Sequence, residues 1–496
     1  MVCRGQIHFG VEATQCPRLD PQKKTKEIVE EFNRLFAQAR PAFNQERVFQ
    51  RAHDMAVNSL LTLGRRTVTG MLSAGGRQFQ DWSAAYRMFE MGRIKQRELF
   101  APAINSVVGN LDAQTPFFAM MDDTLLRKRG RKVSGTAWKR DPLGPAFHAN
   151  FVWGQRYLQI SAALPDIEVA GRARAIPIDF HHAPSPAKPR KKDPPEAWSR
   201  YRDQQKILKV SAVGARRLSE LREQVPDRRI VCAVDGAFTN KELFRAMPEN
   251  TALIGRIRKD ASLFKVPDES DAASRGRKKY YGDPLPTPEE VRQDESVPWQ
   301  KVSAFAAGKQ HEFDVKTMTP VRWKSSGDQD MLIVIVRPLA YRPSKGMRLL
   351  YRNPAYLICS DINMPMEQLL QAYLWRWEIE LNFRDEKSIM GVGEAQVRTP
   401  AAVQNVPAFL VASFAYLLLA SNNIKARSNC LPSPKWYPQE SSNRCTTQKT
   451  LSLFRSQFWG IGSGGNKTGF VHNSFETRTH FFSPNSPNSA LCYAYK

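Results

Sequence analysis

The side chains with the clearest chemical potential lie in one stretch of the sequence, QAYLWRWEIELNFRDEKSIM, residues 371–390. The stretch contains no proline or glycine, so it is predicted to form one helix of more than five turns. At roughly 100° per residue, Tyr373, Arg376 and Lys387 fall within about 60° of Glu380. One helix face therefore carries a carboxylate, two cations and a phenol. It suits a metal ion beside a nucleic-acid phosphate, or it is a solvated face with ordinary charge pairs.

Three aspartates upstream follow apolar runs of strand length. The run FFAMM, residues 117–121, leads into Asp122 and Asp123, and the run IVCAV, residues 230–234, leads into Asp235. A carboxylate at the end of a buried strand is costly unless it has a role, so these positions are candidate metal ligands. One aspartate of the adjacent pair could instead form a turn that ends its strand.

The spacing Y-x-x-R-x-x-x-E-x-x-x-x-x-x-K, formed by Tyr373, Arg376, Glu380 and Lys387, resembles the YREK signature of cut-and-paste bacterial insertion-sequence transposases. That branch belongs to the DDE superfamily. The resemblance implies an α/β fold with a ribonuclease-H-like catalytic core, interrupted by a mostly β insertion and preceded by an N-terminal helical domain. It also implies DNA strand cleavage and strand transfer at the ends of a mobile element.

The resemblance implies a catalytic and metal-binding set of Asp122, Asp235 and Glu380. Family members often carry D-x-T at the first position, which favours Asp122 over Asp123 as the first ligand. The second acid is followed within three residues by an aromatic residue, here Phe238. Three carboxylates held together repel one another, so they need divalent cations. Oxygen ligands select Mg²⁺, with Mn²⁺ as a substitute, and two such ions serve in-line phosphoryl transfer.

The formal net charge of +25 and the pI near 9.9 favour a polyanionic partner, nucleic acid before membrane. The family resemblance implies double-stranded DNA, at transposon ends and target, and a homodimer in the synaptic complex. The predicted DNA contacts come from the signature helix and from two basic runs, RKRGRK and SRGRKK: Tyr373, Arg376, Lys387, Arg127, Lys128, Arg275 and Lys278.

Cysteine usage and apolar runs indicate a cytoplasmic protein, and the family resemblance implies a bacterial, nucleoid-associated one. The seven cysteines are scattered, odd in number and never in C-x-x-C spacing, which argues against a disulfide framework or a zinc site. The N-terminus has no apolar segment typical of a secretory signal. The longest apolar run, residues 406–420, is short for a membrane span and is predicted to be a buried helix.

Composition changes along the chain suggest its division into domains. A Pro- and Lys-rich segment, residues 181–198, is predicted to be an extended surface loop. The predicted parts are a helical, DNA-binding domain (1–114), two parts of the catalytic core (115–259 and 362–425), a mostly β insertion between them (260–361) and a partly disordered C-terminal segment (426–496).

Three other functions are compatible with parts of this pattern. A domesticated transposase would bind DNA without cutting it, and a ribonuclease-H-like nuclease would cut without strand transfer. A structural basic protein would require the spacing of the acids and of the signature to be coincidence. All three acidic positions are present, so the cleaving and strand-transferring enzyme is the favoured hypothesis.

Overall fold

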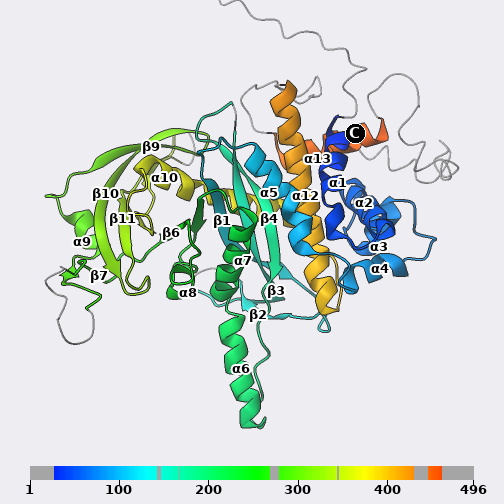
Figure 1. The fold of residues 1–496 in the computed structure, drawn as a ribbon, viewed down its shortest axis with the longest axis horizontal. Helices are drawn as coiled ribbons and strands as arrows, with labels where there is room; N and C mark the ends of the chain where they lie inside the picture. The colour runs from blue at the N-terminus through cyan, green and yellow to red at the C-terminus, as the bar shows by residue number, and fades with distance from the viewer. Residues whose placement is uncertain are drawn as a thin grey trace, which may run out of the picture.

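The computed structural model describes residues 27–141, 144, 147–166, 168–267, 279–342, 346–428 and 445–460. Figure 1 shows a long sheet, with the N-terminal helices gathered at one end and a β-rich wing at the other. One helix, α6 (Pro195–Ile207), projects away from the rest of the molecule.

A sheet of twelve strands runs through the molecule. At its centre, β1 (Phe117–Arg127) pairs antiparallel with β3 (Phe151–Pro165) and parallel with β5 (Ile230–Val234). β6 (Thr251–Arg256) continues the parallel run beside β5. All five residues of β5 are buried, as expected for a strand covered on both faces. Two further strands pair with β3: β2 (Ala137–Arg140) and β4 (Ala173–His182).

The β-rich wing extends this same sheet. β14 (Ala355–Cys359) pairs antiparallel with β6, followed in order by β11 (Asp330–Val336) and β10 (Lys309–Trp323). Most of the regular secondary structure described between residues 260 and 361 is thus β, and the strands of the large sheet join the core through backbone hydrogen bonds. The smaller elements are β7 (Leu263–Phe264), β8 (Pro284–Leu285), α9 (Pro288–Gln293), β9 (Gln300–Ala306), β12 (Ala340–Tyr341) and β13 (Leu350–Tyr351).

The long helix α12 (Pro400–Ser428) forms the centre of the helical side. It packs between β4 and the N-terminal helices, of which α1 (Glu27–Gln38) buries Ile28, Phe32 and Leu35 at helical spacing. Among the described residues, α12 is the one helix long and apolar enough to cross a membrane, and 94% of its apolar window is buried inside the protein. The prediction of a buried helix over residues 406–420 is therefore confirmed. The other helices here are η1 (Arg40–Ala42), α2 (Glu46–Leu61), α3 (Val68–Ala74), α4 (Ser83–Glu90), α5 (Gln96–Gly109) and α13 (Thr447–Trp459).

The signature stretch forms two helices, so the prediction of one continuous helix over residues 371–390 was wrong. α10 (Met366–Trp375) ends and α11 (Trp377–Ser388) begins on either side of Arg376. The amide of Arg376 donates to the carbonyl of Tyr373 at 3.2 Å, and the amide of Ile379 donates to the carbonyl of Arg376 at 3.2 Å. These three-residue hydrogen bonds tighten the backbone at the junction.

Two further expectations need correction. β1 continues beyond residue 121, because β3 pairs with it as far as Arg127, so Asp122 and Asp123 lie within the strand and not at its end. The predicted loop over residues 181–198 is partly regular, because β4 includes both histidines and α6 begins at Pro195. Proline is tolerated in the first helical turn, where its missing amide would have no partner.

Candidate active site

Asp122 and Asp235 are neighbours on adjacent parallel strands. The register pairs Met121 of β1 with Val234 of β5, so the next residue of each strand lies at the same level of the sheet. The prediction of a strand over residues 230–234 is confirmed, and Asp235 follows it directly. The parallel pairing therefore brings together two carboxylates that are more than one hundred residues apart in the sequence.

The alternation of side chains along β1 separates Asp122 from Asp123. Met120 packs in the apolar cluster that contains residues of α10 and α11, whereas Met121 belongs to the cluster of the opposite face. Asp122 follows the side of Met120, because residues two apart share one face of a strand. Asp123 instead pairs with Arg156 of β3, whose Nε is 3.1 Å from its Oδ2. The geometry therefore favours Asp122 as the partner of the α11 carboxylate.

Arg376 connects Asp122 to Glu380. Its Nη1 lies 3.2 Å from Oδ2 of Asp122, and its Nη2 lies 3.2 Å from Oε1 of Glu380. The Arg376 side chain is 13% exposed, and its guanidinium lies 5.9 Å from the ring centroid of Tyr373. Burial opposes its charge, but Tyr373, Asp122, Glu380 and Asp235 together raise its pKa. The tightened turn between α10 and α11 thus carries a cation that bridges two of the three predicted acids.

The three acids influence one another electrostatically. Burial and the charge of Asp235 raise the pKa of Asp122 to about 7, although Arg376 opposes this. Burial also raises the pKa of Glu380, and the charge of Asp235 adds to that effect. The Oδ1 atom of Asp235 accepts hydrogen bonds from two amides of the following turn, those of residues 237 and 238, at 2.9 and 3.1 Å. The site thus gathers more negative charge than one guanidinium offsets.

The donor chemistry of the site fits a hard divalent cation such as Mg²⁺ or Mn²⁺, since all three side chains offer carboxylate oxygens. In the part of the chain that the structure describes, no three His, Cys, Asp or Glu side chains lie close enough to form a ready cation site. Arg376 occupies the space between Asp122 and Glu380 and supplies positive charge there. Binding of a cation by both carboxylates would therefore require the guanidinium to move.

The remaining predicted signature cation, Lys387, lies away from Glu380. Seven residues of helix advance about 10 Å along the axis, so a shared face does not bring the two side chains together. The Lys387 ammonium lies 5.9 Å from the ring centroid of Phe383, and its charge acts on Asp123 and Asp141. Arg127 is exposed and pairs with Asp141 at 2.7 Å. Lys387 and Arg127 thus form a basic border on the Asp123 side of the site.

Lys128 is unavailable to DNA, which corrects its predicted role. It is 7% exposed, and its ammonium donates to the carbonyls of Gly393 and Ala395 at 2.9 and 2.8 Å. Burial lowers its pKa to about 8. Lys128 therefore fastens β1 to the segment after α11. The other two predicted DNA contacts of the basic runs, Arg275 and Lys278, lie outside the described residues.

Sequence reasoning missed two cations beside the acids, Arg156 and Lys139. Both lower the pKa of Asp123, against the larger effect of burial, which raises it. Arg156 lies on β3, which pairs with β1, and Lys139 lies on β2, which pairs with β3, so only strand pairing brings them near. Neither belongs to a motif, and the spacing of the sequence carried no signal for them.

A broad cleft begins at the turn after Asp235. Gly236 and Thr239 line one end of the cleft, which has a volume of about 1080 Å³. Its walls carry two aromatic side chains, Trp323 and Tyr356, and two carboxylates, Asp260 and Glu289. The lining also includes four cations, namely Arg256, Arg258, Lys259 and Arg292. The cleft is therefore both basic and partly aromatic.

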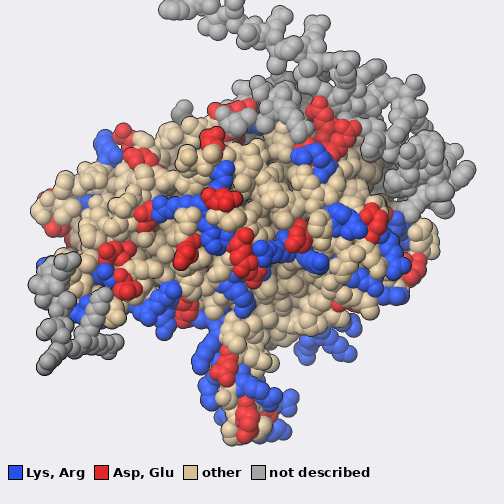
Figure 2. All heavy atoms as spheres, in the orientation of Figure 1, with Lys and Arg blue, Asp and Glu red and all other residues tan. Residues whose placement is uncertain are grey.

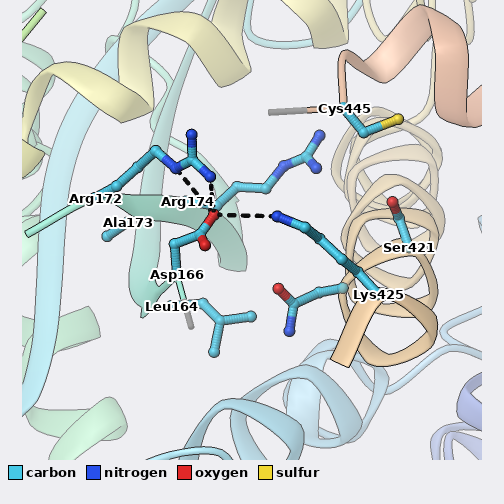
Figure 3. Close-up of a pocket in the computed structure, with 9 residues that line it drawn as sticks. Leu164, Asp166, Arg172, Ala173, Arg174, Ser421, Lys425 and Cys445 are labelled. Carbon is cyan, nitrogen blue, oxygen red and sulfur yellow. Dashed lines mark hydrogen bonds and ion pairs between the residues drawn. The ribbon is translucent and has the colours of Figure 1, made fainter. Parts of the chain in front are cut away.

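A second charged cluster, around a cavity of about 30 Å³, lies apart from the acids (Figure 3). Asp166 pairs with Arg172 at 2.8 Å and with Lys425 of α12 at 3.7 Å, and Lys425 also pairs with Glu168 at 2.7 Å. A space of this size holds one or two water molecules. The charged cluster links the β3–β4 turn to α12, and its cavity is too small for a substrate.

Glu386 is a buried acid that no motif singled out. It is 1% exposed beside the fully buried Gln159, and burial raises its pKa to about 8. In the unfolded chain its carboxyl ionises near pH 4.5, whereas in the folded protein it ionises only near pH 8. The free energy of unfolding should therefore fall as the pH rises through this window.

We expect the free energy of unfolding of Glu386→Gln not to fall in this way, because glutamine stays neutral at every pH. By pH 9 this variant should exceed the wild type in stability by on the order of a few kcal/mol. Urea denaturation of both proteins at pH 5, 7 and 9 measures the difference. The exposed Glu367→Gln on α10 is the matched control and should follow the wild type. Parallel curves for wild type and Glu386→Gln would show that burial does not hold this acid neutral.

Comparison with known proteins places this geometry in a family. No curated protein matches the sequence. The family model described as DDE superfamily endonuclease matches residues 40–329, which include Asp122 and Asp235 and span more than half of the chain. Glu380 lies beyond the matched residues, and its link to Asp122 through Arg376 comes from the structure. The chain therefore belongs to the DDE superfamily endonucleases.

Proposed function

We propose that this endonuclease is a transposase of the YREK-signature, cut-and-paste branch. It cleaves DNA strands at the ends of a mobile element and transfers the freed 3′ ends to target DNA. The observation that carries the proposal is the bridge of Arg376 between Asp122 and Glu380, with Asp235 on the adjacent strand. The three acids come from three separate elements of the chain, and this arrangement supports the proposal.

We assign the catalytic and cation-binding roles to Asp122, Asp235 and Glu380. Mg²⁺, or Mn²⁺ in its place, activates the attacking oxygen and stabilises the leaving oxygen when it is bound at such a site. The positive charge of Arg376 offsets part of the negative charge of Asp122 and Glu380 when DNA and cation are absent. Tyr373, through its contact with Arg376, holds the guanidinium at the break between α10 and α11 and borders the scissile phosphate.

DNA binding is proposed along the basic surfaces that flank the acids. Arg127 and Lys387 border the site on the Asp123 side, and Arg376, which lies between Asp122 and Glu380, would be a further phosphate contact. The cleft after Asp235 adds four cations and two aromatic side chains, a combination that suits a nucleic-acid backbone and its bases. Arg275 and Lys278 remain proposed contacts.

The architecture supports the finer family assignment. The antiparallel strands β4, β3 and β1 are followed in the sheet by the parallel strands β5 and β6, which supports a ribonuclease-H-like core. We propose that residues 260–361 are its β insertion and that residues 1–114 include a DNA-binding helical domain. We also propose that two copies of the chain act together in the synaptic complex.

Metal dependence is the first test of this proposal. We expect purified protein to nick supercoiled plasmid DNA in the presence of Mg²⁺ or Mn²⁺ and to stop when EDTA is added. Agarose electrophoresis of the nicked circles measures the rate. Readdition of Mn²⁺ after EDTA should restore nicking, which separates loss of the cation from loss of the fold. Undiminished nicking in chelator would contradict the proposed chemistry.

Strand transfer requires a second test with the DNA that flanks the gene. A donor plasmid carrying these flanks should yield excised ends and joined products in the presence of target plasmid. Nicking without joining would support a ribonuclease-H-like nuclease in place of a transposase. Binding of the flanks without any nicking would support a domesticated DNA-binding protein.

A further inference from the structure

Helix α6 is an exposed arm. None of its residues, Pro195–Ile207, is buried, and Figure 1 shows it projecting below the sheet, clear of the neighbouring elements. A helix of 13 residues is about 20 Å long. An isolated helix of this length is marginal in water, and packing normally stabilises such helices. Among the described residues, α7 (Val210–Gln224) is the one element with repeated contacts to α6, and a helix packed so little calls for an external partner.

The arm, defined here as residues 184–207, is strongly basic. It contains seven Lys or Arg residues against three Asp or Glu residues. Figure 2 shows Lys and Arg side chains, with Asp and Glu side chains among them, on the projecting part of the molecule. The cations are Lys188, Arg190, Lys191, Lys192, Arg200, Arg202 and Lys206, and all of them are exposed. This composition complements a polyanion.

The charges of α6 are unevenly distributed around the helix. Arg202 and Lys206 lie within about 40° of each other, whereas Glu196 and Asp203 lie about 100–120° from Arg202. Arg200 lies on the side of the two acids. Lys206 is 3.5 Å from Asp203, but both side chains are exposed, so this pair has little energetic weight. One side of the helix is therefore uniformly positive.

The arm lacks the apolar stripe that a protein partner would need. Its two aromatic side chains, Trp198 and Tyr201, contact each other edge to face at 6.2 Å between ring centroids. Ile207 is the one large aliphatic side chain of α6, at 58% exposed. A polyanion is thus the better match for this surface.

The arm leaves the molecule near the acids. Lys209, which follows α6 directly, pairs with Glu242 at 2.7 Å. Glu242 belongs to α8 (Lys241–Phe244), which begins six residues after Asp235. At the other end of the arm, the Lys139 ammonium of β2 donates to the Ser185 hydroxyl. One anchor, Lys139, therefore lies near Asp123, on which its charge acts, and the other lies on the helix that follows Asp235 in the chain.

We propose that the α6 arm grips the phosphate backbone of duplex DNA that extends beyond the cleavage site, through the side of the helix formed by Arg202 and Lys206. This inference deepens the proposed function and rests on it for the nature of the polyanion. The grip is independent of sequence, because phosphate contacts carry no base information. The length of helix α6 corresponds to about six base pairs along one DNA strand.

The test compares charge reversals on opposite sides of α6. Binding of a fluorescein-labelled 30-base-pair duplex of arbitrary sequence is followed by anisotropy between 50 and 300 mM NaCl, roughly the range over which phosphate contacts are lost. Arg202→Glu should raise the Kd about 10-fold at 100 mM NaCl and should lower the slope of log K against log salt by about one unit. The double variant Arg202→Glu/Lys206→Glu should lower that slope by about two units. Arg200→Glu changes the net charge as much as Arg202→Glu and should have clearly less effect. No side chain of α6 is buried, so these variants should fold, which circular dichroism verifies.

The possible results separate the arm from the proposed function. If Arg202→Glu and Arg200→Glu change the Kd for duplex DNA equally, or if neither changes it, the proposed role of the arm is wrong. Plasmid nicking by the wild type would still support the transposase in that case. A shift of the sedimentation coefficient with Arg202→Glu in the absence of DNA would also overturn it, because the arm would then join two copies of the chain. A further result is that Arg202→Glu weakens duplex binding more than Arg200→Glu does while the wild-type protein never nicks plasmid. That result would support the arm and contradict the proposed transposase.

Discussion

Replacement of Glu380 by glutamine is expected to lower metal-dependent plasmid nicking by at least about 100-fold, the upper end of what loss of an outer-shell partner alone costs. Glutamine keeps the shape of the side chain but removes the charge that would bind a cation. It also removes one of the two carboxylates that hold Arg376. The Kd for duplex DNA should remain within about twofold of the wild type or decrease, since a negative charge near phosphate has been removed.

The matched control is Glu378→Gln on the same helix. Glu378 lies two residues from Glu380, about 200° around the helix axis. The Glu378→Gln variant should therefore nick plasmid at close to the wild-type rate. Both variants must be compared at equal salt, because the remaining basic surface dominates DNA affinity at low ionic strength. Normal nicking by Glu380→Gln would show that this side of α11 is only a solvated helix face.

Arg376→Ala is expected to destabilise the metal-free protein by about 1–3 kcal/mol, less than a fully buried ion pair because Glu380 is 35% exposed. The substitution leaves Asp122 and Glu380 without the guanidinium they share. Burial and Asp235 already raise the pKa of Asp122 to about 7, and removal of Arg376 should raise it further. The loss of stability should therefore be greater at pH 8, where the carboxylates are ionised, than at pH 6.

Thermal denaturation at both pH values, with and without Mn²⁺, measures this effect. Mn²⁺ should restore more stability to Arg376→Ala than to the wild type, because the cation then meets uncompensated carboxylates. Arg384→Ala on α11 is the control. Its side chain is 67% exposed and pairs with Asp385, so its loss should change stability by less than about 0.5 kcal/mol. Equal responses of Arg376→Ala and Arg384→Ala would contradict a central role for Arg376 between the acids.

Local patterns in the sequence determined several parts of this molecule. The uninterrupted apolar run over residues 230–234 forms a buried strand that ends at Asp235, and the run over 406–420 lies in a buried helix. Runs of this length and composition bury themselves in almost any compact fold, because the free energy of removing them from water depends little on their neighbours. The four-residue spacing of Arg376 and Glu380 also allowed a charge pair, which the sequence offered only as the alternative to a metal and phosphate site, and the structure contains that pair.

Tertiary packing decided which charged residues surround the acids. Lys128 stands in a basic run that reads as solvent-exposed, yet two carbonyls from the segment after α11 bury its ammonium. Arg156 and Lys139 approach Asp123 only through the pairing of β1, β2 and β3. Burial of a charge depends on partners distant in the chain, and local periodicity carries no information about them.

The choice between Asp122 and Asp123 depended on the fold in the same way. The sequence offered two adjacent carboxylates, and either of them could have ended a strand there. The pairing with β3 extends β1 through both, and side-chain alternation then sends them to opposite faces. Only the packing of α10 and α11 on one of these faces brings Asp122 to Arg376 and, through it, to Glu380. The sequence by itself determined the types and order of the three acids, and the layering of helix on sheet determined which of them share a cation.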